Sequence, residues 1–224
     1  MPKPDRHRSV IPSLLITICL LISLLLWCGC GKSPMLVQKY LLEYPAPVVR
    51  GTPLEQSLGV EKFEVDEAYN RDAMVYRPSP YKSDTYKYSS WRVNPGFMVA
   101  DYLTRDLRES HLFKAVLTAD GSKLTRFILQ GGVREIQELD QGSIWQASLV
   151  LNITLLDTFQ EEITKRVLFQ KIYRATEPLY EKTPAGLAQA MSRALEHLSQ
   201  QIVTDVYLAA KQASSKPVGV SSSK

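Results

Sequence analysis

The chain has 224 residues, of which 45% are hydrophobic and 22% charged, and its formal net charge is +4. This length can bury one sizeable core and is too short for two enzyme domains, so we expect one folded domain. Residues 1–29 carry Lys3, Arg6, Arg8 and Asp5, and without them the charge falls to +2. A nearly neutral chain without a basic stripe excludes nucleic acid as a partner.

The first thirty residues have the layout of a secretory signal peptide. Basic residues precede the uncharged stretch 10–27, which is almost long enough for a transmembrane helix. The residues that follow favour a signal peptide, because the letters WCGC at 27–30 place two small residues before a cysteine, as in a lipobox. We predict a lipoprotein signal peptide at residues 1–29, although tryptophan stands where leucine is usual.

The predicted lipid acceptor is Cys30, which would carry a diacylglyceryl group on its sulfur and an N-acyl chain such as palmitate. No other cofactor is expected. The other cysteines, Cys19 and Cys28, precede the predicted cleavage point, so the mature chain cannot form an intrachain disulfide. Residues 30–39 are predicted to be a lipidated tether of at most about 30 Å. In the alternative interpretation, Cys28 and Cys30 are ordinary small residues of a membrane helix.

Two short strands are predicted after the tether, in residues 40–49 and 57–65. The first ends at Pro45 and Pro47, which lack the amide hydrogens that a central strand needs. The second contains an irregularity, because the alternation of apolar residues slips by one position within it.

Five of the eleven tyrosines lie between residues 69 and 88. This segment contains two predicted strands, AMVYR and DTYKYSSW, joined by the turn PSP. Tyrosine is a good strand residue, and strand packing is the ordinary interpretation. It also gathers at recognition surfaces, because it offers rigid area and a hydroxyl. The functional interpretation is a partner-binding face formed by Tyr76, Tyr81, Tyr86 and Tyr88.

Two amphipathic helices are predicted, and each begins at a capping side chain, Asn94 or Thr183, followed by proline. Apolar residues recur at helical spacing after each start, as far as residue 110 in the first helix and residue 209 in the second. Each helix is therefore expected to cover an apolar surface.

Residues 127–174 give the clearest strand pattern in the chain. Two turns, DQGS and TFQEE, divide them into three long antiparallel strands of a meander, and the third begins at Ile163. Gly131 and Gly132 predict a bulge or a bend in the first strand. One face of the second strand is apolar and holds Trp145, Ala147, Leu149, Leu151, Ile153 and Leu155.

These elements predict a single α+β domain, a mainly antiparallel twisted sheet with two amphipathic helices packed on one face. The domain is expected to occupy residues 40–210. Residues 211–224 are rich in serine and lack periodic apolar residues, so they are predicted to be a disordered tail.

Catalytic motifs are missing from the sequence, which has no HExxH, no paired CxxC, no glycine-rich phosphate loop and no Ser/His/Asp order. His111 and His197 are interpreted as capping or solvated residues. We therefore predict no metal site and no enzyme, and an envelope enzyme is the least favoured hypothesis.

Six features in order resemble the ABC-type transport auxiliary lipoprotein family. They are the lipoprotein cysteine, YLL, LGVEKFEV, MVYR, a Y...W...P approach to the first helix, and LRESHLFKAV, and the resemblance extends over residues 40–210. The tyrosine-rich segment is longer than the family pattern. The resemblance implies a non-catalytic lipoprotein of a Gram-negative envelope that works beside an ABC permease and ATPase.

The resemblance further implies a periplasmic partner with a mammalian-cell-entry (MCE) domain and a role in phospholipid transport between membranes. Gly31 occupies the position after the lipidated cysteine, where an inner-membrane signal usually has aspartate, so the outer membrane is favoured. Ring-forming partners make a homo-oligomer plausible. The alternative is a structural lipoprotein that braces an outer-membrane barrel.

Overall fold

The computed structural model describes residues 36–118, 121 and 124–215, and its folded unit begins at Val37. The predicted signal peptide and Cys30 lie outside the described residues. Strand β1 (Gln38–Tyr40) falls mostly in the predicted tether. The strand predicted for residues 40–49 is therefore wrong after Tyr40. Residues 41–57 instead form an extended segment, which we call the strap, that belongs to no strand of the sheet and contains an isolated bridge from Leu54 to Phe113.

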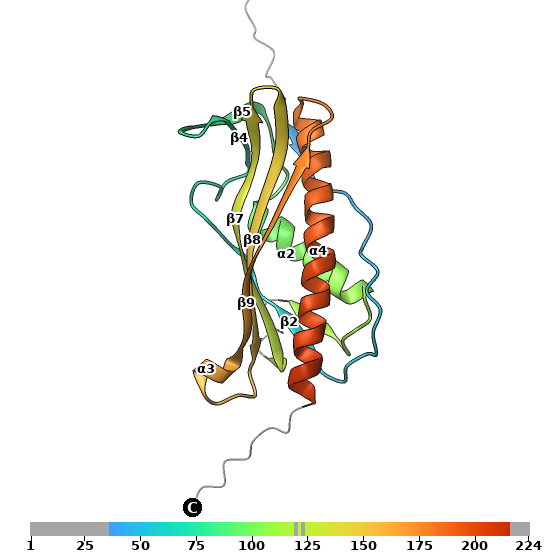
Figure 1. The fold of residues 1–224 in the computed structure, drawn as a ribbon. Coiled ribbons are helices and arrows are strands. Elements are labelled where there is room, and N and C mark those ends of the chain that lie inside the picture. The colour runs from blue at the N-terminus through green and yellow to red at the C-terminus, as the bar shows by residue number, and fades with distance from the viewer. Residues whose placement is uncertain (1–35, 119–120, 122–123, 216–224) are drawn as a thin grey trace, which may run out of the picture. The chain divides into compact units, whose positions relative to one another are not determined.

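The described residues form a nine-stranded sheet and three helices, which confirms the predicted α+β class (Figure 1). After β1 the strands are β2 (Leu58–Val60), β3 (Glu64–Val65), β4 (Ala73–Ser79), β5 (Lys82–Trp91), β6 (Val116–Thr118), β7 (Phe127–Gln141), β8 (Ile144–Asp157) and β9 (Val167–Pro178). The helices are α2 (Pro95–Glu109), α3 (Ile163–Arg166) and α4 (Pro184–Ser214).

The long antiparallel meander is β7, β8 and β9, as predicted. Its second strand buries the five aliphatic side chains from Ala147 to Leu155 that were expected on one face. The third strand begins only at Val167, because Ile163 starts the short helix α3. The bulge of β7 lies between Val133 and Glu135 rather than at the two glycines. Gly131 instead leaves room for the ring of Phe63, which a Cβ atom there would overlap.

The short strands of the N-terminal half add to the meander mainly by parallel pairing, which the sequence did not predict. β2, β3 and β4 each pair in parallel with β7, and β1 pairs in parallel with β5. The predicted second strand is divided into β2 and β3, which agrees with the expected irregularity. β4 and β5 form the predicted antiparallel hairpin.

Both predicted helices begin at the predicted caps. The Asn94 side chain accepts a hydrogen bond from the backbone N–H of Gly96, and Thr183 accepts one from Gly186. In Figure 1, α4 runs along the meander, and its buried face together with that of α2 and the inner face of the sheet forms one hydrophobic core.

The strap is held to α4 by side chains rather than by a strand ladder. The backbone N–H of Glu43 donates to Ser192 Oγ at 2.9 Å. Farther along, the N–H of Thr52 donates to the Tyr207 hydroxyl, which in turn donates to the Thr52 carbonyl. These bonds satisfy backbone groups that would otherwise lack partners.

The predicted boundary at residue 210 is too early, because α4 continues through Ser214. Ala210 is fully buried, and the carbonyl of Ala213 accepts a hydrogen bond from Arg126. Packing and this bond therefore extend the helix into the segment predicted as a tail. Residues 216–224 of that tail lie outside the described residues.

Candidate functional site

The β4–β5 hairpin uses two of its tyrosines to pack against the meander. The ring centroids of Tyr76 and Tyr86 lie 5.2 Å apart, with the rings tilted by 54°. The Tyr86 hydroxyl donates a 2.7 Å hydrogen bond to Oε2 of Glu138 on β7. Tyr76 is paired with the same glutamate in the sheet. Strand packing therefore accounts for these two tyrosines.

Glu138 is a carboxyl group inside the sheet, with only 1% of its surface exposed. Burial raises its pKa, and the hydrogen bond from Tyr86 partly offsets that rise. Burial also raises the pKa of the Tyr86 phenol, and the neighbouring carboxylate raises it further. Oε1 of Glu138 has no hydrogen-bond partner in the part of the chain that the structure describes. The hydrogen bond therefore fastens the β4–β5 hairpin to β7.

The other two tyrosines of the predicted partner-binding face are on the surface. Tyr81 lies in the hairpin turn and is fully exposed. Tyr88 is 37% exposed, and the ammonium of Lys87 lies 5.2 Å from its ring centre. Tyr76 and Tyr86 are half-buried, so Tyr81 and Tyr88 are the more accessible of the four predicted contact residues. Partner binding by these two stays a prediction.

A surface cavity of about 490 Å³ lies beside the hairpin tip, between the β4–β5 and β7–β8 turns. The cavity is open to solvent, and both polar and apolar groups line it. Its lining consists of Arg77, Pro78, Ser79, Pro80, Glu135, Leu139, Asp140 and Gly142. The guanidinium of Arg77 is held by the Pro80 carbonyl, so it stabilises the turn.

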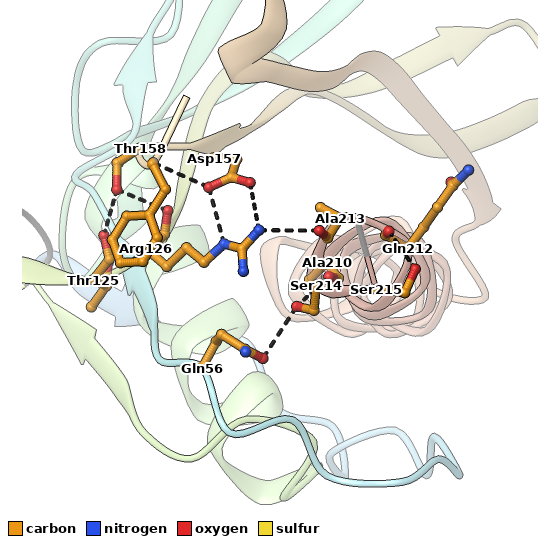
Figure 2. Close-up of polar contacts among 11 residues, drawn as sticks. Gln56, Thr125, Arg126, Asp157, Thr158, Ala210, Gln212, Ala213, Ser214 and Ser215 are labelled. Atoms are coloured by element: carbon orange, nitrogen blue, oxygen red, sulfur yellow. Dashed lines mark hydrogen bonds and ion pairs between the residues drawn. The ribbon is translucent and has the colours of Figure 1, made fainter. Parts of the chain in front are cut away.

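A buried ion pair at the other end of the sheet fastens the last turn of α4 (Figure 2). The guanidinium of Arg126, just before β7, makes two parallel contacts to Asp157, with Nε–Oδ1 at 3.1 Å and NH2–Oδ2 at 3.0 Å. Their side chains are 9% and 1% exposed. The same guanidinium donates to the carbonyl of Ala213 at 3.1 Å. One cation therefore joins the start of β7, the end of β8 and the helix.

The position of this cation suits the helix end. The last carbonyls of a helix lack intrahelical partners and carry the negative pole of its dipole, so a cation there is stabilising. Ser214 also donates from Oγ to the side chain of Gln56 in the strap at 3.1 Å (Figure 2).

Beside the Arg126–Asp157 ion pair lies a second cavity of about 360 Å³, partly lined by Val167 and Ala209. Sequence reasoning missed this site, because Arg126 and Asp157 lie 31 positions apart in the chain.

A second buried carboxylate, Asp106 on α2, was also missed. It accepts a 2.8 Å hydrogen bond from the Tyr44 hydroxyl and another from the hydroxyl of Ser199 on α4. Arg105 donates to its other oxygen from Nε at 2.8 Å and lies over the Tyr44 ring. Burial, and then the nearby carboxylate, raise the pKa of Tyr44. The available signal was helical spacing, because Asp106 lies three residues after Leu103, inside the apolar sector.

The histidines of the described residues are on the surface. The imidazole of His197 is 2.8 Å from the Glu177 carboxylate, and exposed His111 follows α2 with a φ of 54°. Within residues 36–118, 121 and 124–215, no three His, Cys, Asp or Glu side chains gather as a metal site. The same residues contain no helix long and apolar enough to cross a membrane. Cys30 lies outside them, so its lipidation stays a prediction.

Comparison with known families gives one match. A family model described as the ABC-type transport auxiliary lipoprotein component matches residues 40–203, from the last residue of β1 into the second half of α4. Among curated proteins, none matches the chain significantly.

Two solved structures have the same fold. A crystal structure of a Xanthomonas campestris protein of the DUF330 family aligns with a TM-score of 0.72 at 21% identity, covering 80% of this chain and all of the other. A crystal structure of an uncharacterised protein aligns with a TM-score of 0.58 at 12% identity, covering 76% of this chain and 99% of the other. At these identities the likeness concerns the fold.

Proposed function

The chain belongs to the ABC-type transport auxiliary lipoprotein component family, and we propose that it is a non-catalytic auxiliary of a phospholipid transporter. The observation that carries this proposal is the extent of the match. Residues 40–203 include strands β2 to β9, the last residue of β1, helix α2 and most of α4. Most of the folded unit therefore lies within the family match, which supports an auxiliary role.

The proposed membrane attachment is a lipid on Cys30. A single acyl chain gives marginal binding, whereas three chains insert enough methylene groups, at about 0.8 kcal/mol each, to make release negligible. Gly31 in the next position supports attachment to the outer membrane rather than the inner membrane. The domain would then face the periplasm.

The proposed partner is the periplasmic MCE-domain subunit of an ABC permease and ATPase complex. The auxiliary domain would dock this subunit and so help phospholipid pass between the two membranes. Exposed Tyr81 and Tyr88 are the predicted contact residues that the fold leaves free for a partner. Homo-oligomerisation beside a ring-shaped partner stays a proposal.

The anchor is tested with Cys30→Ala and with Cys28→Ala as the matched control, because only the first removes the acceptor sulfur. The wild type and the control should fractionate with the outer membrane and give a triacylated N-terminal peptide in mass spectrometry. Cys30→Ala should give neither. An unmodified Cys30 in membrane-extracted wild type would refute the anchor.

Docking is tested by capture from detergent-solubilised envelopes. The tagged wild type should retain the MCE-domain subunit, and replacing Tyr81 and Tyr88 with alanine should weaken that capture. Retention of a barrel protein with no transporter subunit would instead favour the bracing role.

A further inference from the structure

Large apolar and aromatic side chains are exposed at the end of the domain that carries the β4–β5 turn. Tyr81 is 102% exposed, Tyr180 77% and Ile144 56%. Lysines Lys82 and Lys182 flank them in the sequence. We call these five residues the hairpin-end patch.

The three connections that carry the patch are neighbours in space. The β4–β5 turn and the β7–β8 turn line the same cavity through Pro80 and Gly142. The segment between β9 and α4 joins them, because the ammonium of Lys182 lies 4.2 Å from the ring centre of Trp145. Figure 1 shows these connections together at the upper end of the sheet.

Exposure alone does not distinguish this end from the opposite one. Leu124, Phe159 and Ile163 are exposed at the opposite end to a similar degree. A tethered domain can place only one end against its membrane. The direction in which the tether leaves the domain decides between them.

The pairing of β1 shows that direction. β1 is parallel to β5, with Gln38 opposite Ser89, so the chain before Gln38 enters from the side of the β4–β5 turn. From Ser89 to Lys82 at that turn, the strand covers about 23 Å. The eight residue steps from Cys30 to Gln38 span about 26 Å when extended. The tether is therefore long enough to bring the hairpin end to its membrane.

The tether is too short to bring the opposite end of the domain to the membrane. The registers of β4, β5 and β7 place Gln38 about eight residues, or about 26 Å, from Phe127 at that end of β7. A tether running that way must first reverse its direction. A reversal uses about four residues, and the remaining four extend only about 14 Å.

We propose that the hairpin-end patch lies against the phospholipid bilayer that holds the lipidated cysteine. Tyrosine places its ring at the headgroup level of a membrane, isoleucine inserts, and lysine keeps its ammonium in water. The patch presents this combination on three adjacent connections. The inference rests on the proposed lipid anchor, and for Tyr81 it competes with the partner-binding prediction.

The test uses the full lipidated protein in vesicles of phosphatidylethanolamine and phosphatidylglycerol that contain a nitroxide-labelled phospholipid. Tyr81→Cys carries a fluorescent thiol label, and the matched control is Ile163→Cys at the opposite end. Because an acylated Cys30 leaves no free thiol, the label reaches only the introduced cysteine. Circular dichroism checks that both variants are folded.

Quenching by the labelled lipid should be at least about threefold stronger at position 81 than at position 163. Equal quenching, or stronger quenching at position 163, would overturn the inference. Shielding of position 81 only after addition of the periplasmic subunit would do the same and would assign the residue to that partner. The unsubstituted protein tests the anchor separately, because it takes up label only if Cys30 is not acylated or if the segment with Cys19 and Cys28 has not been removed.

Discussion

Replacing Arg126 with alanine should destabilise the domain more than the loss of an ordinary ion pair. The change removes two contacts to Asp157 and one to the Ala213 carbonyl. Asp157 is 1% exposed, so it would remain as a buried charge without its cation. Breaking such a pair costs about 3 to 5 kcal/mol, which corresponds to a decrease in Tm of roughly 6 to 20 °C for a domain of this size.

The assay is urea unfolding of the detergent-solubilised protein, followed by circular dichroism. The matched control is Arg134→Ala, because Arg134 and Asp66 form an ion pair of similar length whose side chains are about half exposed. That control should cost no more than about 1 kcal/mol. If Arg126→Ala and the control lowered the free energy of unfolding equally, burial of the Arg126–Asp157 pair would not be the source of its effect.

Three further changes test the packing. Burial raises the pKa of Glu138, so this carboxyl group keeps its proton to higher pH in the folded state than in the unfolded chain. Stability therefore falls as the pH rises between the two pKa values. Glu138→Gln should remove that fall in urea titrations at pH 4 to 7, and an unchanged dependence of stability on pH would contradict the prediction. Gly131→Ala should cost about 1 to 3 kcal/mol, because the new methyl group overlaps the Phe63 ring, and pairing it with Phe63→Leu should recover part of the loss. Thr183→Ala removes the cap of α4 and should cost about 1 kcal/mol, whereas Thr183→Ser should be nearly neutral.

The features that the sequence predicted well are those that depend on local patterns of residues. The starts of α2 and α4 depend on a capping residue and the proline after it, and both helices begin as expected. The meander follows from strict alternation along β8, where one face meets the core. Ile163 fits the same alternation, yet it belongs to a short helix that reverses the chain before β9.

Features set by distant partners were not predictable from one sequence. The parallel pairing of β2, β3 and β4 with β7 joins segments at least 60 positions apart. Gly131 was interpreted as a bend, although its role depends on Phe63 from another part of the chain. In the candidate site, composition identified the tyrosines. It did not show which of them pack beside Glu138 and which are exposed, because burial is decided by the tertiary structure.

The way the strap is attached affects local unfolding of the domain. The strap's backbone has almost no ladder of its own, and at Glu43 and Thr52 it is bound to side chains of α4. Segments with few backbone partners open and close with whatever supports them. Fraying of α4 would therefore release the amides of Glu43 and Thr52 at the same time, so these two positions should exchange their amide hydrogens together with the part of α4 that lies about 150 positions away.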